Sequence, residues 1–549
     1  MSGLLVLLLT ISFHQISSFS PVLNSVSGSS SLYSATSSSA DYDYDLTVIG
    51  AGVVGVQAAL AAASAQNKRV CLIDAPRASG ELMNPVTEED LSIGAPTGLF
   101  GKALRDTSKR INVATLRGMG LREESVWNEI ISSCLDLAAS NAQDIQRQLN
   151  DAGVDFVEGL AAFPDTGDTH LLSVLTSQGK WSTVKTDKVL LATGSTPFRP
   201  TGIPFDGQRI FDSDSINQLS FLPKSIAITG SGIIAIEYAK IFQKLGAEVT
   251  MIIRDNVPRN ALMKIGLDRD IAATLVADLV RSGIKIERGA QVASFDVPED
   301  NVLAPITLTL EARGGGTLPQ GRRTEVKCQA YLAAVGRQPN TGNANLRSAG
   351  IEVDEYGGVL VDSSLKTTAP LGNVFAAGDI VGRPFLASTG TAQGLAAVAE
   401  MFKDQENCEI EYAEDGTLCF DPSSLASNPF AVPSGIWSSP EAAYFGLSVQ
   451  QAKDMDIDAG EGTALYAECL RGRVFSPNGL LKIVFDKKDG KIIGVHIVGE
   501  DACELIHYGM VSFRALMLST VRIIEFSSHN RIRFNYHRNW STENELSPN

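Results

Sequence analysis

The sequence predicts an α/β fold that contains two parallel-sheet domains of the same design, followed by an α+β domain. The first observation is a strand–turn–helix–strand unit: an apolar strand at 46–50, the turn GAGVVG, an alanine-rich helix to about residue 66 and a strand at 69–73. The second is the same order about 180 residues later, with strands at 225–229 and 248–253 around GSGIIA. A βαβ unit that occurs twice indicates two Rossmann-like nucleotide-binding domains.

The first turn carries the glycine spacing that binds a dinucleotide. Gly50 permits the tight turn, Gly52 lets a diphosphate approach the backbone, and Gly55 allows the helix to pack closely on the strand. The amino end of the helix offers free N–H groups to that diphosphate. Asp74 ends the second strand, where a carboxylate would accept hydrogen bonds from the hydroxyls of an adenosine ribose. The alternative is a glycine-rich turn without a ligand, but strand, glycines, helix and acid all occur in the order that binding requires.

The second turn has the same spacing, with Gly230, Gly232 and Ala235 at the three positions. No acid stands at the end of its second strand; Arg254 lies near the expected position, and Arg259 follows five residues later. Guanidinium groups pair with a 2′-phosphate, whereas an acid there would repel it. This site therefore favours NADP over NAD. The alternative is that both arginines are solvated surface charges.

The composition fits a large globular chain and excludes several other classes. With 549 residues, of which 44% are hydrophobic and 20% charged, the chain can fill several cores. Its net charge of −16 argues against nucleic acid and anionic membrane surfaces as partners. The seven cysteines are scattered, with no Cys-x-x-Cys and no ligand-like cluster, so we expect neither a disulfide scaffold nor a metal site.

The first forty or so residues have the pattern of a targeting signal. Residues 4–12 form an apolar run that is too short to span a bilayer but suits the core of a signal peptide. A Ser-Ser-Phe stretch, Pro21 and a serine-rich tract follow, and this order resembles the bipartite plastid presequence of algae with complex plastids. No Lys or Arg precedes Lys68, whereas transit peptides are usually rich in Arg, so ordinary secretion is the alternative. We expect a plastid location, with no membrane span in the mature protein.

Further motifs make a resemblance to one family specific. Besides the two turns, they are LLATGSTP (190–197), AAVGRQPNT (333–341), VFAAGDI (374–380), WSSPEAAYFGL (437–447) and GVHIVGEDACELIH (494–507). With these motifs in this order, the chain from about 43 to about 510 resembles the class I pyridine nucleotide-disulfide oxidoreductases. That family includes dihydrolipoamide dehydrogenase, glutathione reductase, mercuric reductase and soluble pyridine nucleotide transhydrogenase.

The resemblance implies FAD in the first site and NADP(H), or else NAD(H), in the second. It implies that Asp379 hydrogen-bonds the ribityl chain of the flavin. The motif residues that it assigns to cofactor binding, besides the two turns and Asp74, are Thr193, Gly194, Gly336, Arg337, Gly378 and Asp379. It also implies a homodimer, provided that the carboxy-terminal domain is intact.

Two residues match the family's charged positions at the flavin. Lys102 matches the lysine near flavin N5, where a fixed cation stabilises the reduced, anionic flavin. Glu237 would lie beside the nicotinamide and could pair with Lys102. The alternative for Lys102 is an ordinary surface charge on a helix.

The domain organisation follows from the repeat and the resemblance. Residues 123–152 show apolar positions at helical spacing and predict one long helix inside the first domain. The second nucleotide-binding domain is inserted in the first. The predicted segments, in chain order, are a targeting presequence (1–41), the first half of the FAD-binding domain (42–200), the NAD(P)-binding domain (201–344), the second half of the FAD-binding domain (345–400), an acidic insertion or linker (401–430), an α+β dimerisation domain (431–510) and an atypical tail (511–549).

The redox-active cysteine pair of the family's disulfide reductases is missing. Those enzymes carry Cys-x4-Cys ahead of the lysine, but counting back from Lys102 places Ile93 and Gly98 at the two sulfur positions. No cysteine occurs between Cys71 and Cys134. Without two thiolates, a flavin cannot pass electrons through sulfur exchange. We therefore expect hydride to pass directly from NADPH through FAD to a second nicotinamide or another small acceptor, as in soluble transhydrogenase.

Two other functions stay open. One is a dihydrolipoamide dehydrogenase-like enzyme whose cysteine pair is brought together by folding. The other is a catalytically degenerate FAD-binding protein, which the tail suggests. After Met510 the chain departs from the family's closing segment, although Phe534-Asn535-Tyr536 echoes the transhydrogenase ending. We assign no catalytic role to the histidines of this tail, and a retained intron from Val511 would account for it.

Overall fold

The computed structural model of this chain describes residues 42–75, 99–110, 123–176, 179–298, 301, 304–319, 321–403 and 432–509. It also gives the backbone of two short strands, β22 (Glu525–Phe526) and β23 (Ile532–Arg533), which pair antiparallel. The expected presequence, almost all of the acidic insertion and most of the tail lie outside these residues.

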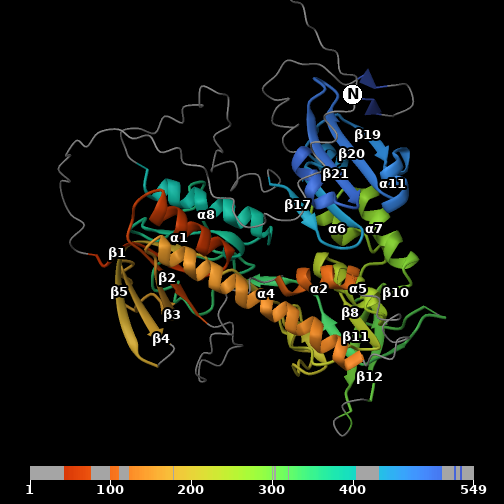
Figure 1. The fold of residues 1–549 in the computed structure, drawn as a ribbon, viewed down its shortest axis with the longest axis horizontal. Coiled ribbons are helices and arrows are strands. Elements are labelled where there is room, and N and C mark those ends of the chain that lie inside the picture. The colour runs from red at the N-terminus through yellow and green to blue at the C-terminus, as the bar shows by residue number, and fades with distance from the viewer. Residues whose placement is uncertain are drawn as a thin grey trace, which may run out of the picture. The chain divides into compact units, whose positions relative to one another are not determined.

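The first sheet is the core of the first nucleotide-binding domain (Figure 1). Its strands are β1 (Tyr44–Ile49), β2 (Val70–Asp74), β3 (Asp155–Ala162), β4 (Leu171–Thr176), β5 (Trp181–Leu191) and β16 (Val374–Ala376). Parallel pairing runs β3-β2-β1-β5-β16, while β4 joins β3 and β5 as an antiparallel meander. β16 begins 183 residues after the end of β5 in the sequence, yet the two strands pair in one sheet. The second domain, which lies between them in the sequence, is therefore inserted in the first, as predicted.

Three helices pack with this sheet: α1 (Val53–Ser64), α4 (Glu123–Asp151) and α8 (Ala387–Met401). The small side chains of α1 let it approach its neighbours closely, and α8 lies against it (Figure 1). At Gly390 of α8, a Cβ would stand only 2.7 Å from Val54 Cγ2. The long helix that helical spacing predicted over 123–152 is confirmed as α4.

The second domain repeats the design. Its parallel sheet has the order β10-β9-β8-β14-β7, made of β7 (Ile210–Asp212), β8 (Ser225–Thr229), β9 (Glu248–Ile253), β10 (Lys285–Arg288) and β14 (Ala330–Ala333). The helices are α5 (Ile233–Lys244), α6 (Asn260–Lys264), α7 (Arg269–Arg281) and η3 (Ser215–Gln218). An antiparallel sheet of β11 (Ala290–Asp296), β12 (Ile306–Ala312) and β13 (Glu325–Cys328) is added to it.

The chain crosses between the two domains through one short ladder. It leaves the first domain by β6 (Ser195–Pro197) and returns by β15 (Arg337–Pro339), and these two strands pair antiparallel. After the return come β16 and the short helix η4 (Gly378–Val381). The two crossing segments are thereby held side by side at the first domain's edge.

The third domain is an antiparallel sheet with helices, which confirms the predicted α+β class. Its strand order is β17-β18-β21-β20-β19, with β17 (Ser434–Ile436), β18 (Glu441–Gly446), β19 (Ala459–Leu465), β20 (Leu480–Asp486) and β21 (Ile492–Gly499). The helices are α10 (Val449–Asp454), η6 (Tyr466–Glu468), α11 (Leu470–Phe475) and a helical segment at 502–509. One further helix, α2 (Leu99–Arg110), packs on α5 and α4.

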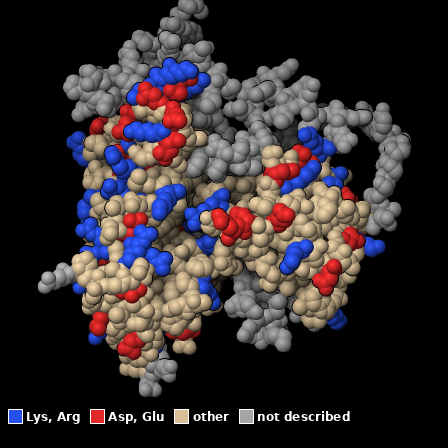
Figure 2. Space-filling view, turned by 180° about the vertical axis from the view of Figure 1, so that it is seen from behind, with Lys and Arg blue, Asp and Glu red and all other residues tan. Residues whose placement is uncertain are grey.

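Surface and composition of the described residues set simple bounds. None of their helices combines the length and the apolar character that crossing a membrane requires. On the face shown in Figure 2, basic and acidic side chains are interspersed rather than gathered by sign. No group of three or more metal-ligating side chains occurs among the residues that the structure describes.

Candidate functional site

Two of the three glycines in the first turn are required by the protein itself. Gly50 has φ +107°, and a Cβ there would stand 2.4 Å from the carbonyl oxygen of Ala192. At Gly55, a Cβ would stand 1.9 Å from the Gly50 carbonyl oxygen. The turn from β1 into α1 can therefore be closed only with glycine at these two positions.

The middle glycine of each turn is not required by any steric contact within the described protein. Gly52 has φ −69° and a Cβ there would meet nothing within 4 Å. Gly232 repeats this in the second domain, with φ −83° and open space. Since no protein atom requires glycine at either position, the open space in front of each backbone is the feature that a diphosphate fits. The flanking positions repeat as well: a Cβ on Gly230 would stand 2.2 Å from Ala334 O, and Ala235 is fully buried.

Both helices that follow these glycines begin without a cap from a side chain. Gly52 is the N-cap of α1 and Gly232 is the N-cap of α5, and neither helix has an acidic residue in its first turn. The first N–H groups of a helix have no partner inside it and carry the positive end of the helix dipole. Each open space is thus lined by donors suited to a phosphate.

Asp74 lies at the end of β2, beside the first turn. It is 3% exposed, and its Oδ1 accepts a hydrogen bond of 3.0 Å from the N–H of Ala51. One carboxylate oxygen therefore fixes the turn between Gly50 and Gly52. The contact of Asp74 with an adenosine ribose stays a prediction.

The two arginines of the second site stand where the sequence places them. Arg254 follows β9 directly and is exposed, and Arg259 is the N-cap residue of α6 and is partly buried. Within the described residues, neither guanidinium forms an ion pair. Asp255 was not predicted as a residue of this site. Its carboxylate accepts hydrogen bonds from the Val257 N–H (3.4 Å) and Asn260 Nδ2 (3.2 Å), which keeps it inside its own loop.

The structure brings Lys102 and Glu237 close together by packing α2 on α5. Gly101 stands at this contact, where a Cβ would be 3.3 Å from the Tyr238 hydroxyl oxygen. Burial raises the pKa of Glu237, while a hydrogen bond from the Trp437 N–H and the charges of Lys102 and Arg105 act in the opposite direction. The Glu237 carboxyl group therefore lies in the electrostatic field of two cations, Lys102 and Arg105.

Trp437 of the third domain contacts Glu237, Lys102 and Arg105. It was not among the predicted site residues. The N–H of Trp437 donates to Glu237 Oε1 at 2.8 Å. Its ring centroid lies 5.1 Å from Lys102 Nζ and 4.7 Å from the Arg105 guanidinium carbon. No ion pair joins Lys102 to Glu237 directly in the described part of the chain. Trp437 carried a weak signal, since it opens one of the quoted motifs.

The remaining predicted residues meet at the crossing ladder. Ser195 donates to Asp379 Oδ2 at 2.6 Å and accepts from Arg337 Nε at 2.8 Å. Arg337 also pairs with Asp214 at 2.7 Å, and its side chain is only 8% exposed. Burial raises the pKa of Asp379, against the hydrogen bond from Ser195 and the charge of Arg337. Arg337 thus acts between the two domains, as part of the protein's own hydrogen bonding.

The other motif residues of this region hold the ladder or the turn beside it. The Thr193 hydroxyl donates to the Asn340 carbonyl at 2.7 Å, and the Gly194 carbonyl accepts from the Asn340 N–H at 2.9 Å. Gly336 and Gly378 both have positive φ, of +128° and +81°. Two of them lie beside the first turn and its helix: a Cβ on Gly50 would stand 3.1 Å from Thr193 Cα, and a Cβ on Gly378 would stand 3.0 Å from Val54 Cγ2.

The described cysteines form no pair. Burial raises the pKa of the Cys71 thiol to about 12, of Cys134 to about 11 and of Cys328 to about 12. Cys503 is buried too and Cys469 is exposed, and all five thiols are free. Ile93 and Gly98, the residues at the expected sulfur positions, lie outside the described residues. A thiolate pair is therefore not supplied by any cysteine that the structure describes.

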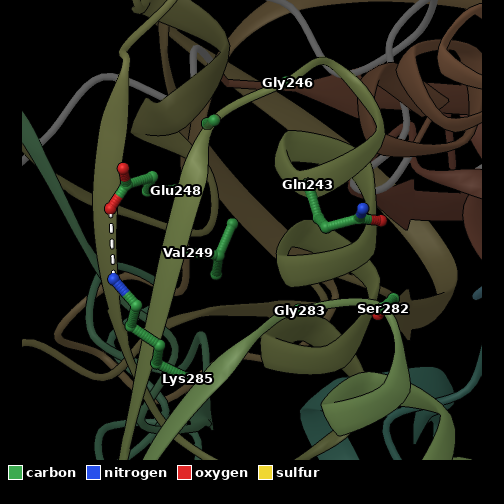
Figure 3. A pocket seen from close by; sticks show the side chains of 8 residues that line it. Gln243, Gly246, Glu248, Val249, Ser282, Gly283 and Lys285 are labelled. Carbon is green, nitrogen blue, oxygen red and sulfur yellow. Dashed lines mark hydrogen bonds and ion pairs between the residues drawn. The ribbon is translucent and has the colours of Figure 1, made fainter.

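One hollow of about 440 Å³ lies at the amino end of the strands of the second sheet, away from its glycine turn (Figure 3). It is lined by the end of α5 and the start of β9 and β10, including Gln243, Gly246 and Val249, and by an ion pair of 3.1 Å between Lys285 and Glu248. The glycine turns stand at the carboxyl ends of the strands, where ligands of such sheets bind. This hollow is therefore not the nucleotide site.

Known proteins resemble the chain over most of its length. Residues 44–394 match the family described as pyridine nucleotide-disulphide oxidoreductase, and residues 432–525 match the dimerisation domain of the same family. Soluble pyridine nucleotide transhydrogenase from Colwellia psychrerythraea is 30% identical over 481 residues, covering 85% of this chain and 90% of the relative. The protein of the same name from Mycobacterium tuberculosis is 29% identical over 480 residues, with coverage of 85% and 90%.

Solved structures show the same fold. LpdA from Mycobacterium tuberculosis superposes with a TM-score of 0.68 at 23% identity, covering 85% of this chain and 93% of the other. The HOCl-induced flavoprotein disulfide reductase RclA from Escherichia coli gives 0.66 at 22% identity, covering 86% and 93%.

Proposed function

This chain belongs to the pyridine nucleotide-disulphide oxidoreductase family, and from that premise we propose that it passes hydride from NADPH through FAD to a second nicotinamide or another small acceptor. It is a flavin-dependent NAD(P)H oxidoreductase of the transhydrogenase-like kind. One observation carries the proposal: the chain has two open diphosphate cradles of identical design and no cysteine between Cys71 and Cys134. Hydride that enters through one nucleotide site must then leave without a disulfide.

The first cradle is assigned to FAD. Gly52 and the amino end of α1 would hold its diphosphate, and Asp74 and Asp379 would face its ribose and ribityl hydroxyls. When bound, FAD accepts a hydride from a reduced nicotinamide and delivers it to an acceptor. The protein's role is to hold the reacting carbon and nitrogen of the two groups close together, so no acid–base residue is strictly needed.

The second cradle is assigned to NADPH. Gly232 and the amino end of α5 would hold the diphosphate, while Arg254 and Arg259, which form no ion pair with any residue that the structure describes, would pair with a 2′-phosphate. Asp255 does not oppose this because its carboxylate is bound within its own loop. A ping-pong order follows, in which NADPH would deliver its hydride and NADP⁺ would leave before the acceptor enters.

Lys102 and Glu237 are proposed to set the charge at the meeting point of the two cofactors. An ammonium group fixed near the flavin edge stabilises the negative charge that develops there on reduction. Glu237, on the first turns of α5, faces the same point and keeps Lys102 and Arg105 oriented through its field. Neither residue has to give up a proton in this role.

An anaerobic titration tests the function. NADPH should bleach the flavin absorbance band of the purified protein, and thio-NAD should then restore it while being reduced. Lipoamide activity that is abolished by alkylation of the thiols would reveal a cysteine pair brought together by folding and would contradict this account. If neither NADPH nor NADH bleaches bound FAD, the chain is a degenerate FAD-binding protein, the candidate that the altered tail favours.

Assembly and location are proposed on separate grounds. The match to the dimerisation domain supports a homodimer, which sedimentation of the purified protein measures. The signal-like run at 4–12 and the serine-rich tract after it support delivery to a plastid. Fusing residues 1–41 to a fluorescent protein tests this, and export of the fusion from the cell would instead establish secretion.

A further inference from the structure

Trp437 stands where the third domain meets α2 and α5. It follows β17 directly, and its backbone N–H holds the Glu237 carboxylate at 2.8 Å. Its ring faces Lys102 and Arg105 of α2 at 5.1 and 4.7 Å. One residue of the third domain therefore contacts both of the charged residues that the proposed function assigns to the flavin edge.

The position of the indole ring is restricted by its own domain. At Gly435, two residues before Trp437, a Cβ would stand 2.9 Å from Cys503 Sγ and 3.4 Å from the indole Nε1. Only a glycine at this position lets the strand and the ring pack so closely on the helical segment at 502–509. The ring is partly buried, so it is a fixed surface under the cations rather than a free side chain.

A buried ion pair fixes α2 against the same domain. The Arg105 guanidinium lies 3.3 Å from Glu441 Oε1, and the two side chains are 7% and 10% exposed. Lys109, one turn further, lies 3.6 Å from the same carboxylate, whose other oxygen accepts the Cys503 N–H at 3.2 Å. Arg105 also pairs with Asp106 of α2 itself at 2.6 Å, so it would keep a partner if the domains separated. Glu441 would not, because both of its cations come from α2, and this holds α2 in one orientation. The approach of Lys102 to Trp437 follows from that orientation.

We propose that Trp437 is a positioning residue, which holds Lys102 over its ring and Glu237 by its N–H and so fixes the charge at the flavin edge. This inference rests on the proposed function. The face of an indole attracts an ammonium group, and Lys102 has no ion pair in the described residues that would otherwise restrain it. The third domain thus contributes to the reaction centre of its own chain.

The substitution Trp437→Leu removes the ring face and keeps the backbone N–H. Because Lys102 is exposed, one ammonium–indole contact biases an equilibrium by roughly two- to fivefold. For a two-electron couple, its loss lowers the midpoint potential of bound FAD by at most roughly 10–20 mV. Trp437→Phe, which retains an aromatic face, should restore most of the potential. At saturating NADPH the reduction rate should fall in Trp437→Leu, while the KM for NADPH, set by Arg254 and Arg259, should not change.

The potential is measured by anaerobic titration with dithionite and a reference dye, so it needs no nicotinamide. If NADPH fails to reduce the wild-type flavin, the proposed function is wrong, yet this titration still tests Trp437. Trp181→Leu is the matched control, because Trp181 is 67% exposed and distant in the fold on β5. Its potential should equal that of the wild type.

Coupling to Lys102 separates positioning from a merely structural role. In the Lys102→Met background, Trp437→Leu should lower the potential no further, because Lys102 is gone and Arg105, the other cation on the ring, stays fixed by its ion pair with Glu441. An unchanged potential in Trp437→Leu with only a lower melting temperature, or full additivity with Lys102→Met, would overturn the proposal. If Trp437→Leu does not fold, Trp437→Met carries the same test, since an unbranched side chain fills irregular space.

Discussion

Replacing Arg254 and Arg259 with alanine should convert the preferred donor from NADPH towards NADH. Both guanidinium groups stand at the carboxyl end of β9, and neither forms an ion pair in the described residues. They are therefore available to a 2′-phosphate, the group by which NADPH differs from NADH. NADH lacks that phosphate, so its binding should be nearly indifferent to both changes.

The expected size follows from exposure. A hydrogen bond to a charged group contributes about 1.5–3 kcal/mol. Because Arg254 is exposed and Arg259 only partly buried, we take the lower end for each. That corresponds to about tenfold per arginine. The double variant should lower the ratio of kcat/KM for NADPH over that for NADH by roughly 100-fold, less if the two residues share one phosphate oxygen.

Initial rates with NADPH and NADH, at one ionic strength near 0.15 M, provide the measurement. Arg281→Ala is the matched control: Arg281 is 49% exposed and ends α7 just before β10 begins, so it lies at the amino end of the strands, whereas Arg254 follows the carboxyl end of β9. At this ionic strength charges more than about 8 Å from the phosphate are largely screened, so the control should retain the preference for NADPH. An equal loss with both donors in the double variant would refute the reasoning, as would the same change in Arg281→Ala.

Three other predictions test the fold and the site. Gly52→Val should fold but lose most of its FAD, because the valine side chain enters the open space in which the diphosphate would lie. In the control Gly202→Val, the side chain also meets no protein atom, and this variant should keep its FAD. If Gly52→Val does not fold, Gly52 is needed for the structure itself. Burial raises the pKa of Glu237 above its usual 4.5. Between the unfolded and the folded pKa, the folded chain keeps a proton that the unfolded chain has lost. The free energy of unfolding therefore falls as pH rises from 4.5 to the folded pKa. Glu237→Gln should therefore gain melting temperature over the wild type between pH 4 and 8, whereas the exposed Glu248→Gln should not, and a parallel course would contradict the burial argument. Lys482 is 2% exposed and pairs with Asp268, Asp270 and Glu461. Lys482→Met should lower the free energy of unfolding by about 3–5 kcal/mol, or the melting temperature by at least about 6 °C. Replacing the exposed Lys487 with Met should lower the free energy of unfolding by less than about 1 kcal/mol. Equal melting temperatures in these two variants would remove the buried cluster as a link between the second and third domains.

The sequence by itself determined the two nucleotide-binding domains and their order. These features are local: Gly55 is required by the Gly50 carbonyl oxygen of the same turn, Gly50 by its own positive φ, and strand and helix periodicity extends over single elements. The absence of cysteine between Cys71 and Cys134 needs no structure at all. The insertion of one domain in the other also followed from motif order, and β16 confirmed it.

Only the tertiary structure decided what surrounds the charged pair. Lys102, Glu237 and Trp437 are separated by 135 and 200 residues, and no periodicity in the sequence relates them. Their meeting depends on α2 packing on α5 and on the buried pair of Arg105 with Glu441. The ladder role of Arg337 depends in the same way on contacts that folding creates, since its partners Ser195 and Asp214 lie 142 and 123 residues away. Local spacing specifies a cradle for a phosphate, whereas the field at the reacting atoms is set by side chains that converge from three domains.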